Sequence, residues 1–359
     1  MELRTIYSLD DQLVRITELS PSGYSAMRAG CLYPFVISKT IKDLKLNGWL
    51  IPNLNKAAYF GTIAHKLLEE RVYGRIQDQR QYIQMWKQLA DEKIAEIKGS
   101  FPSITDFRLT DYSVVLKNCN AALKVKPYSA EDCQGSSTNK RTLERFVKVD
   151  GLISGFIDRL IFKSDGLEII DYKTGEIFEE SGAIKESIRL QMQLYAIACE
   201  SELNRSVISL KVLHTPTSTI VDIPIERDRF LEIKSEIRNL IAFCNNAIET
   251  QNISSLQKPN EHCGFCNCCH LCDSFIQSSP DNKYFVYGKV IDNSNPNMLM
   301  VKNPIGEQIV VNNLSDMNIG NWDDLLGKTL AFINVRSFVD GIYQRLSNTI
   351  IYIIKDSNE

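Results

Sequence analysis

Three residues near the middle of the chain have the types and spacing of a hydrolytic metal site. Asp158 lies in GFIDRL, and Asp171 and Lys173 lie two positions apart in IIDYKTG. Mg²⁺ in proteins is usually held by one or two carboxylates together with substrate phosphate. A metal held in this way polarises the phosphoryl oxygen and generates hydroxide from water, and a neighbouring lysine stabilises the charge that develops. Taken alone, the Asp-x-Lys tripeptide is common and is typical of a solvated strand end.

Further polar residues flank this group on both sides in the sequence. FGTIAHKLLEE precedes it with a glycine and a histidine four positions apart, and LQMQLYA follows it with a glutamine and a tyrosine that share one face of an expected helix. By itself, each pair is typical of an ordinary amphipathic helix. In chain order the patterns are GxxxH, GxxD, DxK and QxxxY, at Gly61–His65, Gly155–Asp158, Asp171–Lys173 and Gln191–Tyr195.

This ordered set resembles the RecB-like branch of the PD-(D/E)xK nuclease superfamily. The resemblance implies hydrolysis of DNA phosphodiester bonds with Mg²⁺ or Mn²⁺ as the metal. The groups that it implies as metal ligands are the side chains of His65, Asp158 and Asp171 and the backbone carbonyl of Tyr172. The catalytic residues that it implies are His65, Asp158, Asp171 and Lys173, with Lys173 as the catalytic lysine. It also implies that Gln191 and Tyr195 position the site or the nucleic-acid strand. The chain departs from the superfamily pattern at Ile157, where a proline would precede the aspartate.

Half of the ten cysteines lie in one short segment, HCGFCNCCHLC, between Cys263 and Cys272. Two kinds of metal site explain such bunching. Four of the thiolates could bind structural zinc, for which CxxC pairs such as Cys263/Cys266 and Cys269/Cys272 are usual. Alternatively, three of them join a distant cysteine around an iron–sulfur cluster. Zinc bound within so short a segment would be cramped, because the two pairs normally lie on separate turns.

A second resemblance concerns this segment and the start of the chain. LSPSGYSAMRAGCLYPFVISK is similar to the N-terminal region of iron–sulfur members of the RecB-like branch, such as CRISPR-associated exonucleases and the nuclease domain of the AddB recombination subunit. The resemblance, which covers about residues 20–276, implies a [4Fe–4S] cluster, with structural Zn²⁺ as the alternative. It leaves Cys268 and Cys269 without a role. The cluster ligands that it implies are Cys31, Cys263, Cys266 and Cys272.

Length and composition limit the classes of protein that the chain can belong to. With 359 residues, 44% hydrophobic and 24% charged, it is a globular chain too long for a single core, so a large domain and a smaller one are expected. The 41 basic and 44 acidic residues give a net charge of −3, which argues against binding nucleic acid by bulk charge and in favour of a local groove.

The start of the chain and its hydropathy indicate a compartment. MELRTIYSLDD has no charged region followed by an apolar one, so no secretory signal is expected. No stretch approaches the roughly 18 uninterrupted apolar residues of a membrane span. We therefore expect a cytoplasmic protein without membrane contact, in a reducing environment where thiolates bind metals more often than they form disulfides.

The elements that must position the candidate residues follow from periodicity and turn residues. Helices are expected over 20–46, with Ser20 as N-cap, Pro21 at the first position and an interruption at Pro34. A second helical stretch, 56–99, should break near Gly74. A polar loop is expected at 129–142. Beyond it, the expected strands are 146–150, 152–163, 167–175, 207–215 and 219–225, and the expected helices are 183–202 and 227–250.

The C-terminal part of the sequence changes character after a break at 277–282. Five strand-like segments follow, with a short helix expected at 321–327 between the third and the fourth. This order resembles an OB-fold, a small barrel that often binds single strands; an unrelated small barrel serving as a scaffold is the alternative. The expected fold is α/β: a PD-(D/E)xK restriction-endonuclease-like core with an iron–sulfur staple in 1–279, helical over about 56–128, and a small OB-like β-barrel domain in 280–359.

Together these features predict a metal-dependent deoxyribonuclease that acts on DNA with single-stranded regions or ends. An exonuclease or end-processing role in DNA repair, CRISPR adaptation or phage defence is expected. The sequence has no GxxxxGK[ST] segment and hence no recognisable ATP-driven motor, so a helicase or another DNA-processing protein is the expected partner. The alternative is a non-catalytic nucleic-acid-binding or scaffold subunit of a larger complex.

Overall fold

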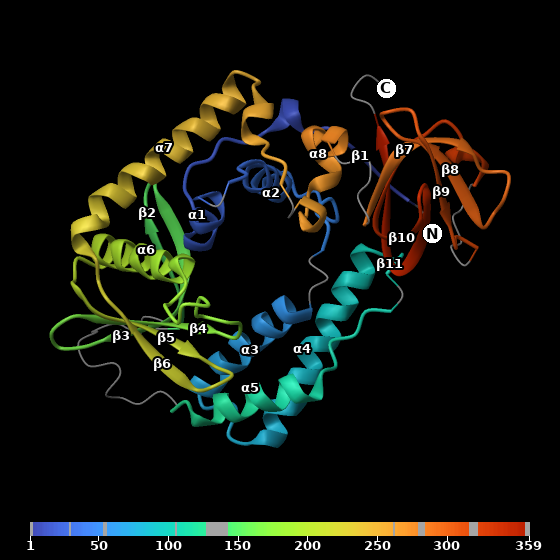
Figure 1. Ribbon diagram of the computed structural model, residues 1–359. Helices are drawn as coiled ribbons and strands as arrows, with labels where there is room; N and C mark the ends of the chain where they lie inside the picture. The colour runs from blue at the N-terminus through green and yellow to red at the C-terminus, as the bar shows by residue number, and fades with distance from the viewer. Residues whose placement is uncertain are drawn as a thin grey trace.

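Two β-sheets and the helices between them follow one another around a ring in the computed structural model (Figure 1). A five-stranded sheet lies on one side of the ring and a six-stranded sheet on the other. None of the helices in the described part of the chain combines the length and the apolar character that crossing a membrane requires. The structure describes residues 3–28, 30–52, 56–104, 106–126, 143–260, 263–278, 284–315 and 322–355.

The five-stranded sheet has the order β2-β3-β4-β5-β6. Its strands are β2 (Leu143–Val149), β3 (Ile153–Phe162), β4 (Leu167–Lys173), β5 (Val207–His214) and β6 (Thr219–Ile223). Neighbouring strands are antiparallel except for β4 and β5, which are parallel. A parallel pair needs a crossover, and α6 (Glu186–Leu203) provides it. The strands expected in this region and the helix expected at 183–202 are confirmed.

Among the described residues, the α-helices before this sheet are α1 (Pro21–Arg28), α2 (Tyr33–Asp43), α3 (Lys56–Val72), α4 (Gln79–Ser100) and α5 (Tyr112–Lys124). The expected cap of α1 is confirmed, because the backbone N–H of Gly23 donates to Ser20 Oγ at 3.0 Å. Pro34 lies in the first turn of α2, so the expected interruption separates two helices. Gly74 follows α3 with a φ of +76°, which glycine adopts without strain. The expected loop at 129–142 lies outside the described residues.

Short turns connect the long helix α7 (Phe230–Glu249) to the second sheet. They include the 3-10 helices η4 (Ile253–Leu256), η5 (Cys263–Phe265) and η6 (Cys269–Leu271), followed by α8 (Asp273–Ser278). The backbone N–H of Leu32 donates to the carbonyl of Leu256 at 3.1 Å. This contact places the residues just before the cysteine segment beside the start of α2.

The second sheet closes on itself. Its strands are β7 (Phe285–Asp292), β8 (Met298–Lys302), β9 (Gln308–Asn312), β10 (Thr329–Val339) and β11 (Ile342–Lys355). β7, β8 and β9 pair in succession, β9 pairs with β11, β11 with β10, and β10 with β7. Among these five described strands of the closed sheet, β9 and β11 form the one parallel pair. The short helix expected before the fourth strand is η7 (Asp323–Leu325).

A sixth strand joins this sheet from the start of the chain. β1 (Arg4–Tyr7) pairs in parallel with β11. The sequence alone does not predict this strand, because four residues carry too little periodicity. Residues 4–7 therefore belong to the sheet of the expected 280–359 unit, although they precede the nuclease region in the chain; the two-domain division itself stays a prediction.

One hydrophobic core links the two sheets. It runs from the helices through the five-stranded sheet and takes in Ala331, Ile350 and Tyr352 of the second sheet. A separate small core, including Leu299, Val311 and Phe332, fills the interior of the closed sheet. The closed sheet is thus packed on one side against the rest of the molecule.

Candidate metal-dependent active site

The hairpin of β3 and β4 brings Asp158 next to the DxK residues. Extending its register by one position puts Asp158 opposite Asp171, and the backbone N–H of Tyr172 donates to Asp158 Oδ2 at 2.7 Å. Asp171 and Lys173 lie on one face of β4, as strand alternation predicts. Lys173 Nζ is 2.8 Å from Asp171 Oδ2. Two strands therefore place two carboxylates and one ammonium group at the same edge.

α3 delivers the histidine to this edge. His65 Nδ1 lies 3.5 Å from Asp158 Oδ2, and the imidazole meets the ring of Tyr172 edge-on with centroids 6.1 Å apart. Gly61 permits the approach, because a Cβ at that position would lie 2.9 Å from Thr174 Oγ1, just beyond β4. The GxxxH pattern thus combines a close helix–strand contact with the imidazole that this contact positions.

α6 supplies a chain of polar side chains that holds the lysine. Lys173 Nζ donates to Gln191 Oε1 at 2.7 Å, and Gln191 Nε2 donates to the hydroxyl of Tyr195 at 3.1 Å. The spacing of four residues puts Gln191 and Tyr195 on the same face of the helix. Lys173 is therefore held from two sides, by Asp171 and by Gln191.

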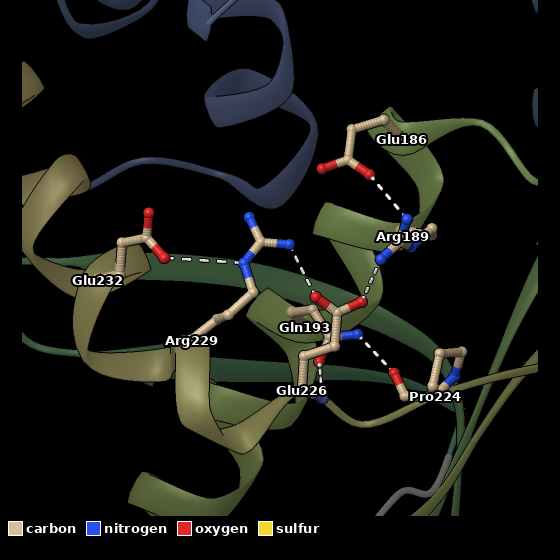
Figure 2. A network of polar contacts seen from close by, with 7 residues as sticks. All are labelled: Glu186, Arg189, Gln193, Pro224, Glu226, Arg229 and Glu232. Atoms are coloured by element: carbon tan, nitrogen blue, oxygen red, sulfur yellow. Dashed lines mark hydrogen bonds and ion pairs between the residues drawn. The ribbon is translucent and has the colours of Figure 1, made fainter.

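Another face of α6 is fastened by the polar network in Figure 2. Glu226 accepts hydrogen bonds from Arg189 at 2.5 Å and from Arg229 at 2.7 Å. Gln193 accepts the backbone N–H of Glu226 at 3.0 Å and donates to the carbonyl of Pro224 at 2.8 Å. Burial raises the pKa of Glu226, but the two arginines outweigh burial and hold it below its usual value. The network fixes the helix that carries Gln191 to the segment between β6 and α7.

Two features of the site were not read from the sequence. Asn118 of α5 accepts a hydrogen bond from the Thr215 hydroxyl at 3.3 Å, and the Thr215 backbone N–H donates to the carbonyl of Lys173 at 2.8 Å. These contacts hold the end of β4. Neither Asn118 nor Thr215 belongs to a recognisable sequence pattern. The role of Gly155 did have a signal, the GxxD spacing: a Cβ there would lie 2.8 Å from Pro21 Cδ of α1.

The charged groups of the site shift one another's protonation. Burial raises the pKa of Asp171 to about 6; the charge of Asp158 adds to this effect, while Lys173 and His65 oppose it. Burial lowers the pKa of His65, but the hydrogen bond and charge of Asp158 and the charge of Asp171 outweigh it, so the pKa of His65 is raised. Both shifts have the same meaning: this site favours added positive charge.

The donor set has the chemistry that a hard divalent cation requires, namely two carboxylates, an imidazole and a backbone carbonyl. Asp171 Oδ2 is buried and, besides the ion pair with Lys173, accepts no hydrogen bond from the described residues. In the part of the chain that the structure describes, no group of three or more His, Cys, Asp or Glu side chains lies close enough together to hold a metal ion. The donors pair instead, Asp171 with Lys173 and Asp158 with His65. Binding a cation here would exchange these pairings for metal–ligand contacts.

The cysteine segment meets Cys31, which is more than 200 residues away in the chain. The backbone N–H of Lys258 donates to Cys31 Sγ at 3.4 Å, and that of Asn260 donates to Cys263 Sγ at 3.1 Å. Burial, and to a smaller extent the charges of Cys31, Cys266 and Cys263, raise the pKa of Cys272 to about 12. These thiols therefore affect one another's protonation, but no three Cys, His, Asp or Glu side chains of the described residues converge here as a metal site requires.

Cys266 differs from the other cysteines of the segment. Its sulfur lies 3.5 Å from that of Cys268, and the hydrogen bond from Cys268 lowers the pKa of Cys266 to about 7. Cys268 and Cys269 are buried, and burial raises the pKa of Cys269. Cys266 is therefore the thiol of this segment that is most readily ionised at neutral pH. The scattered Cys119, Cys199 and Cys244 are buried, as expected, whereas Cys133 and His262 lie outside the described residues.

His270 connects the cysteine segment to the second sheet. Its Nε2 lies 2.9 Å from the carbonyl oxygen of Trp49, and its ring stacks on Tyr352 of β11 with centroids 4.6 Å apart. Burial lowers its pKa to about 3, so the imidazole is neutral at physiological pH. The Tyr352 hydroxyl in turn donates to the carbonyl of Gly48 at 3.0 Å. His270 thus has a packing role in the structure.

A mixed α/β core with two carboxylates and a lysine on adjacent strands is the arrangement of a metal-dependent nuclease core. A family model described as the PD-(D/E)XK nuclease superfamily matches residues 18–273. The chain belongs to the PD-(D/E)XK nuclease superfamily. Members of this superfamily typically use Mg²⁺ or Mn²⁺ and act on DNA. The strands of the second sheet lie outside the matched residues, β1 before them and β7 to β11 after them.

Other comparisons add little to this assignment. No curated protein matches the sequence. A solved structure titled "Crystal structure of SSO0001" is similar over 60% of this chain and 98% of its own, with 14% sequence identity and a TM-score of 0.26.

Proposed function

We propose that this protein is a metal-dependent deoxyribonuclease of the RecB-like branch, similar to CRISPR-associated exonucleases and the AddB nuclease domain. One observation carries the proposal: four patterns that are spread over 135 positions of sequence, from Gly61 to Tyr195, meet in one site. Their side chains come from α3, β3, β4 and α6. A solvated set of unrelated polar residues would have no reason to converge in this order.

The proposed roles follow from the contacts of each group. His65, Asp158, Asp171 and the carbonyl of Tyr172 would hold Mg²⁺ or Mn²⁺. The bound metal would supply Lewis acidity and an activated water near neutral pH. Lys173, kept in place by Gln191, would stabilise negative charge on the phosphate.

We propose single-stranded DNA, or DNA with single-stranded ends, as the substrate, and exonucleolytic or end-processing cleavage as the reaction. The similarity of the ordered patterns to CRISPR-associated and recombination nucleases supports this choice, and with it a role in DNA repair, CRISPR adaptation or phage defence. The lack of an ATP-driven motor in the sequence supports a helicase or another DNA-processing protein as partner.

For the cysteine segment we propose a [4Fe–4S] cluster held by Cys31, Cys263, Cys266 and Cys272, with structural Zn²⁺ as the alternative. The mutual charge effects of the four thiols and the backbone N–H groups that point at Cys31 and Cys263 support this ligand set. Bound there, the cluster would join the start of α2 to the end of the nuclease core.

For the closed sheet we propose an OB-like barrel. The pairing order β7-β8-β9-β11-β10, the parallel contact between β9 and β11, and the short helix before β10 support it. A scaffold barrel of another kind is the alternative.

The nuclease proposal is tested by cleavage of labelled single-stranded DNA with Mg²⁺ or Mn²⁺. Lys173→Ala removes the ammonium group and should lower the rate at least about 100-fold. Lys211→Ala is the matched control, because Lys211 pairs with Glu168 on the neighbouring strand, away from the site, and it should cleave like the parent. Equal cleavage by Lys173→Ala and the parent would refute the proposal.

A non-catalytic nucleic-acid-binding or scaffold subunit is the second candidate. It is favoured by the pairing of the donors with one another, Lys173 on Asp171 and His65 on Asp158. Tight binding of a single strand by the parent, without turnover in any divalent metal, would select this function over the nuclease.

A further inference from the structure

Two lysines face each other in a hollow on the outer face of the closed sheet. The hollow has a volume of about 340 Å³, and Lys289, Lys302 and Thr329 are among the residues that line it. Lys289 of β7 is the direct partner of Lys302 on β8 and of Thr329 on β10. Direct partners on antiparallel strands have their side chains on the same face, with Cβ atoms about 5 Å apart. Two positive charges therefore lie side by side in one concave wall.

No acidic group in the described part of the chain neutralises this pair. Neither lysine forms an ion pair with another described residue, and no carboxylate is among the residues that line the hollow. Glu307, in the turn after β8, instead accepts a hydrogen bond from Asn303 Nδ2 at 3.0 Å. Like charges directly opposite one another destabilise a sheet. The free protein therefore carries a repulsion that an anion between the two ammonium groups would remove.

Protection of a sheet edge does not explain the pair. Lysines often keep edge strands from pairing with other chains, but β7 lies between β10 and β8, and β8 lies between β7 and β9. Gly288, the residue before Lys289, also lets the two strands approach closely, because a Cβ there would lie 2.5 Å from the carbonyl oxygen of Lys302. The sheet thus brings the two lysines together at a place where no edge needs protection.

The remaining walls of the hollow indicate the kind of anion. Tyr287 lies two positions before Lys289 on the same face of β7, half-buried against the core that links the two sheets. Ile291 and Pro304 add apolar surface. Proteins bind single strands by combining positive charge for the phosphates with aromatic side chains for the bases. A nucleotide fits both parts of the hollow, whereas an acidic peptide has the charge without the flat apolar group.

We propose that this hollow binds a nucleotide of single-stranded DNA, with its phosphate between Lys289 and Lys302. The inference rests on the proposed nuclease function, from which DNA follows as the anion. It adds a contact with the strand outside residues 18–273, which match the nuclease superfamily. The hydroxyl of Thr329 is a further donor to the phosphate. All three residues bind the strand and take no part in bond cleavage.

The experiment measures binding without cleavage. In the Lys173→Ala background, anisotropy gives the affinity for a fluorescein-labelled oligothymidylate with Lys289→Gln, with Lys302→Gln and with both. Each single change should weaken binding about 10-fold at low salt, as expected for the loss of one charged hydrogen bond. The slope of log K against log salt concentration should become shallower by about 0.7 for each lysine removed, because each phosphate contact releases counterions.

Two control variants separate this site from a general effect of charge or of stability. Arg336→Gln removes a positive charge from an exposed position of β10 outside the hollow, and it should bind like the background protein. Lys302→Arg keeps the charge and should retain binding. Without DNA, the thermal unfolding midpoint of Lys289→Gln should equal or exceed that of the background protein, since the change relieves the like-charge pair. A lower midpoint would contradict the repulsion.

The outcomes distinguish this site from the nuclease function. Equal affinities of Lys289→Gln and Arg336→Gln would overturn the site. Displacement of the oligonucleotide by polyglutamate as readily as by unlabelled oligothymidylate, at equal charge concentration, would also overturn it and would assign the hollow to an acidic protein. Cleavage by the parent, together with lysine variants that bind DNA normally, refutes only the site. Absence of cleavage by the parent with any divalent metal refutes the nuclease function.

Discussion

The carboxylate site and the cysteine segment gather residues from distant parts of the chain in two different ways. At the carboxylate site every group lies on a strand or a long helix, and regular alternation fixes its direction. At the cysteine segment the thiols lie in short 3-10 helices and in the irregular residues beside them, where no repeat fixes their direction. We therefore expect the geometry of the carboxylate site to persist without a metal, and the geometry of the cysteine segment to depend on what its thiols bind. The comparison predicts an exchangeable metal at the first site and a tightly held group at the second.

The largest expected effect separates the two sites by chelation. EDTA should abolish cleavage, because an oxygen-rich site releases its divalent metal readily, and excess Mg²⁺ or Mn²⁺ should restore it. Asp158→Asn should lower the rate by about 10²-fold or more even in excess metal. The control is Asp222→Asn, at an exposed position of β6. Metal analysis after chelation should still find the metal of the cysteine segment. If EDTA removed that metal together with the activity, the two sites would not differ in how tightly they hold their metals.

The next effect is at the cysteine segment. Cys31→Ser should remove the tightly held metal and lower the free energy of unfolding by about 3 kcal/mol or more, since a ligand bound only to the folded state stabilises it. Cys119→Ala, at a buried cysteine of α5, should leave the metal content unchanged.

Anaerobic purification with a visible spectrum and an iron assay identifies the group that is lost. A brown parent protein with roughly four irons per chain is expected. Zinc without iron would refute the cluster in favour of the zinc alternative, and a Cys31→Ser protein with undiminished iron would exclude Cys31 from the ligands.

A smaller effect concerns the protonation of the metal-free carboxylate site. The pKa of Asp171 is raised from 3.8 to about 6 in the folded protein. The folded state therefore binds the proton more tightly, and the stabilisation this gives is present below about pH 4 and lost as pH rises through 6. Asp171→Asn has no carboxyl group to titrate, so its stability does not fall with pH for this reason. The difference in unfolding free energy, variant minus parent, should rise by about 3 kcal/mol from pH 4 to pH 8. Urea unfolding in EDTA at both pH values measures it, and parallel pH profiles would contradict it.

The smallest effect distinguishes two glutamines of α6. Gln191→Leu removes the acceptor of the Lys173 ammonium and should lower kcat about 10-fold, equivalent to about 1.4 kcal/mol, with little change in stability. Gln193→Leu breaks the buried network of Figure 2 and should lower stability by about 1–3 kcal/mol with little change in kcat. Steady-state kinetics and thermal unfolding of both variants test the contrast; identical behaviour would show that α6 acts as one unit.

The sequence predicted those parts of the fold that local rules determine. Ser20 and Pro21 mark the start of α1, and Gly74 follows the end of α3. Alternation also predicted that Asp171 and Lys173 share a face. For the candidate site, the order of the patterns indicated which residues would meet, and the structure brings them together, although their catalytic and metal-binding roles stay predictions.

Other features depend on tertiary packing and left no local trace. The side chain of Asp171 is only 3% exposed, and that burial, which raises its pKa, depends on which elements pack around β4. The support of β4 by Asn118 and Thr215 joins residues 97 positions apart. The opposition of Lys289 and Lys302 likewise depends on the register of β7 against β8. Each of these requires knowing which elements lie side by side.

The pairing of β1 with β11 has a consequence for the synthesis of the chain. Arg4 pairs with Tyr352, and Tyr7 with Lys355, so β1 has to wait for its partner strand until β11 has been synthesised. Contacts of such long sequence separation form late in folding. The nuclease core, whose strands lie close together in the chain, can assemble during translation. The closed sheet is completed only once β11 has been synthesised. A chain that stops short of β11 leaves β1 without its partner strand and His270 without the ring of Tyr352.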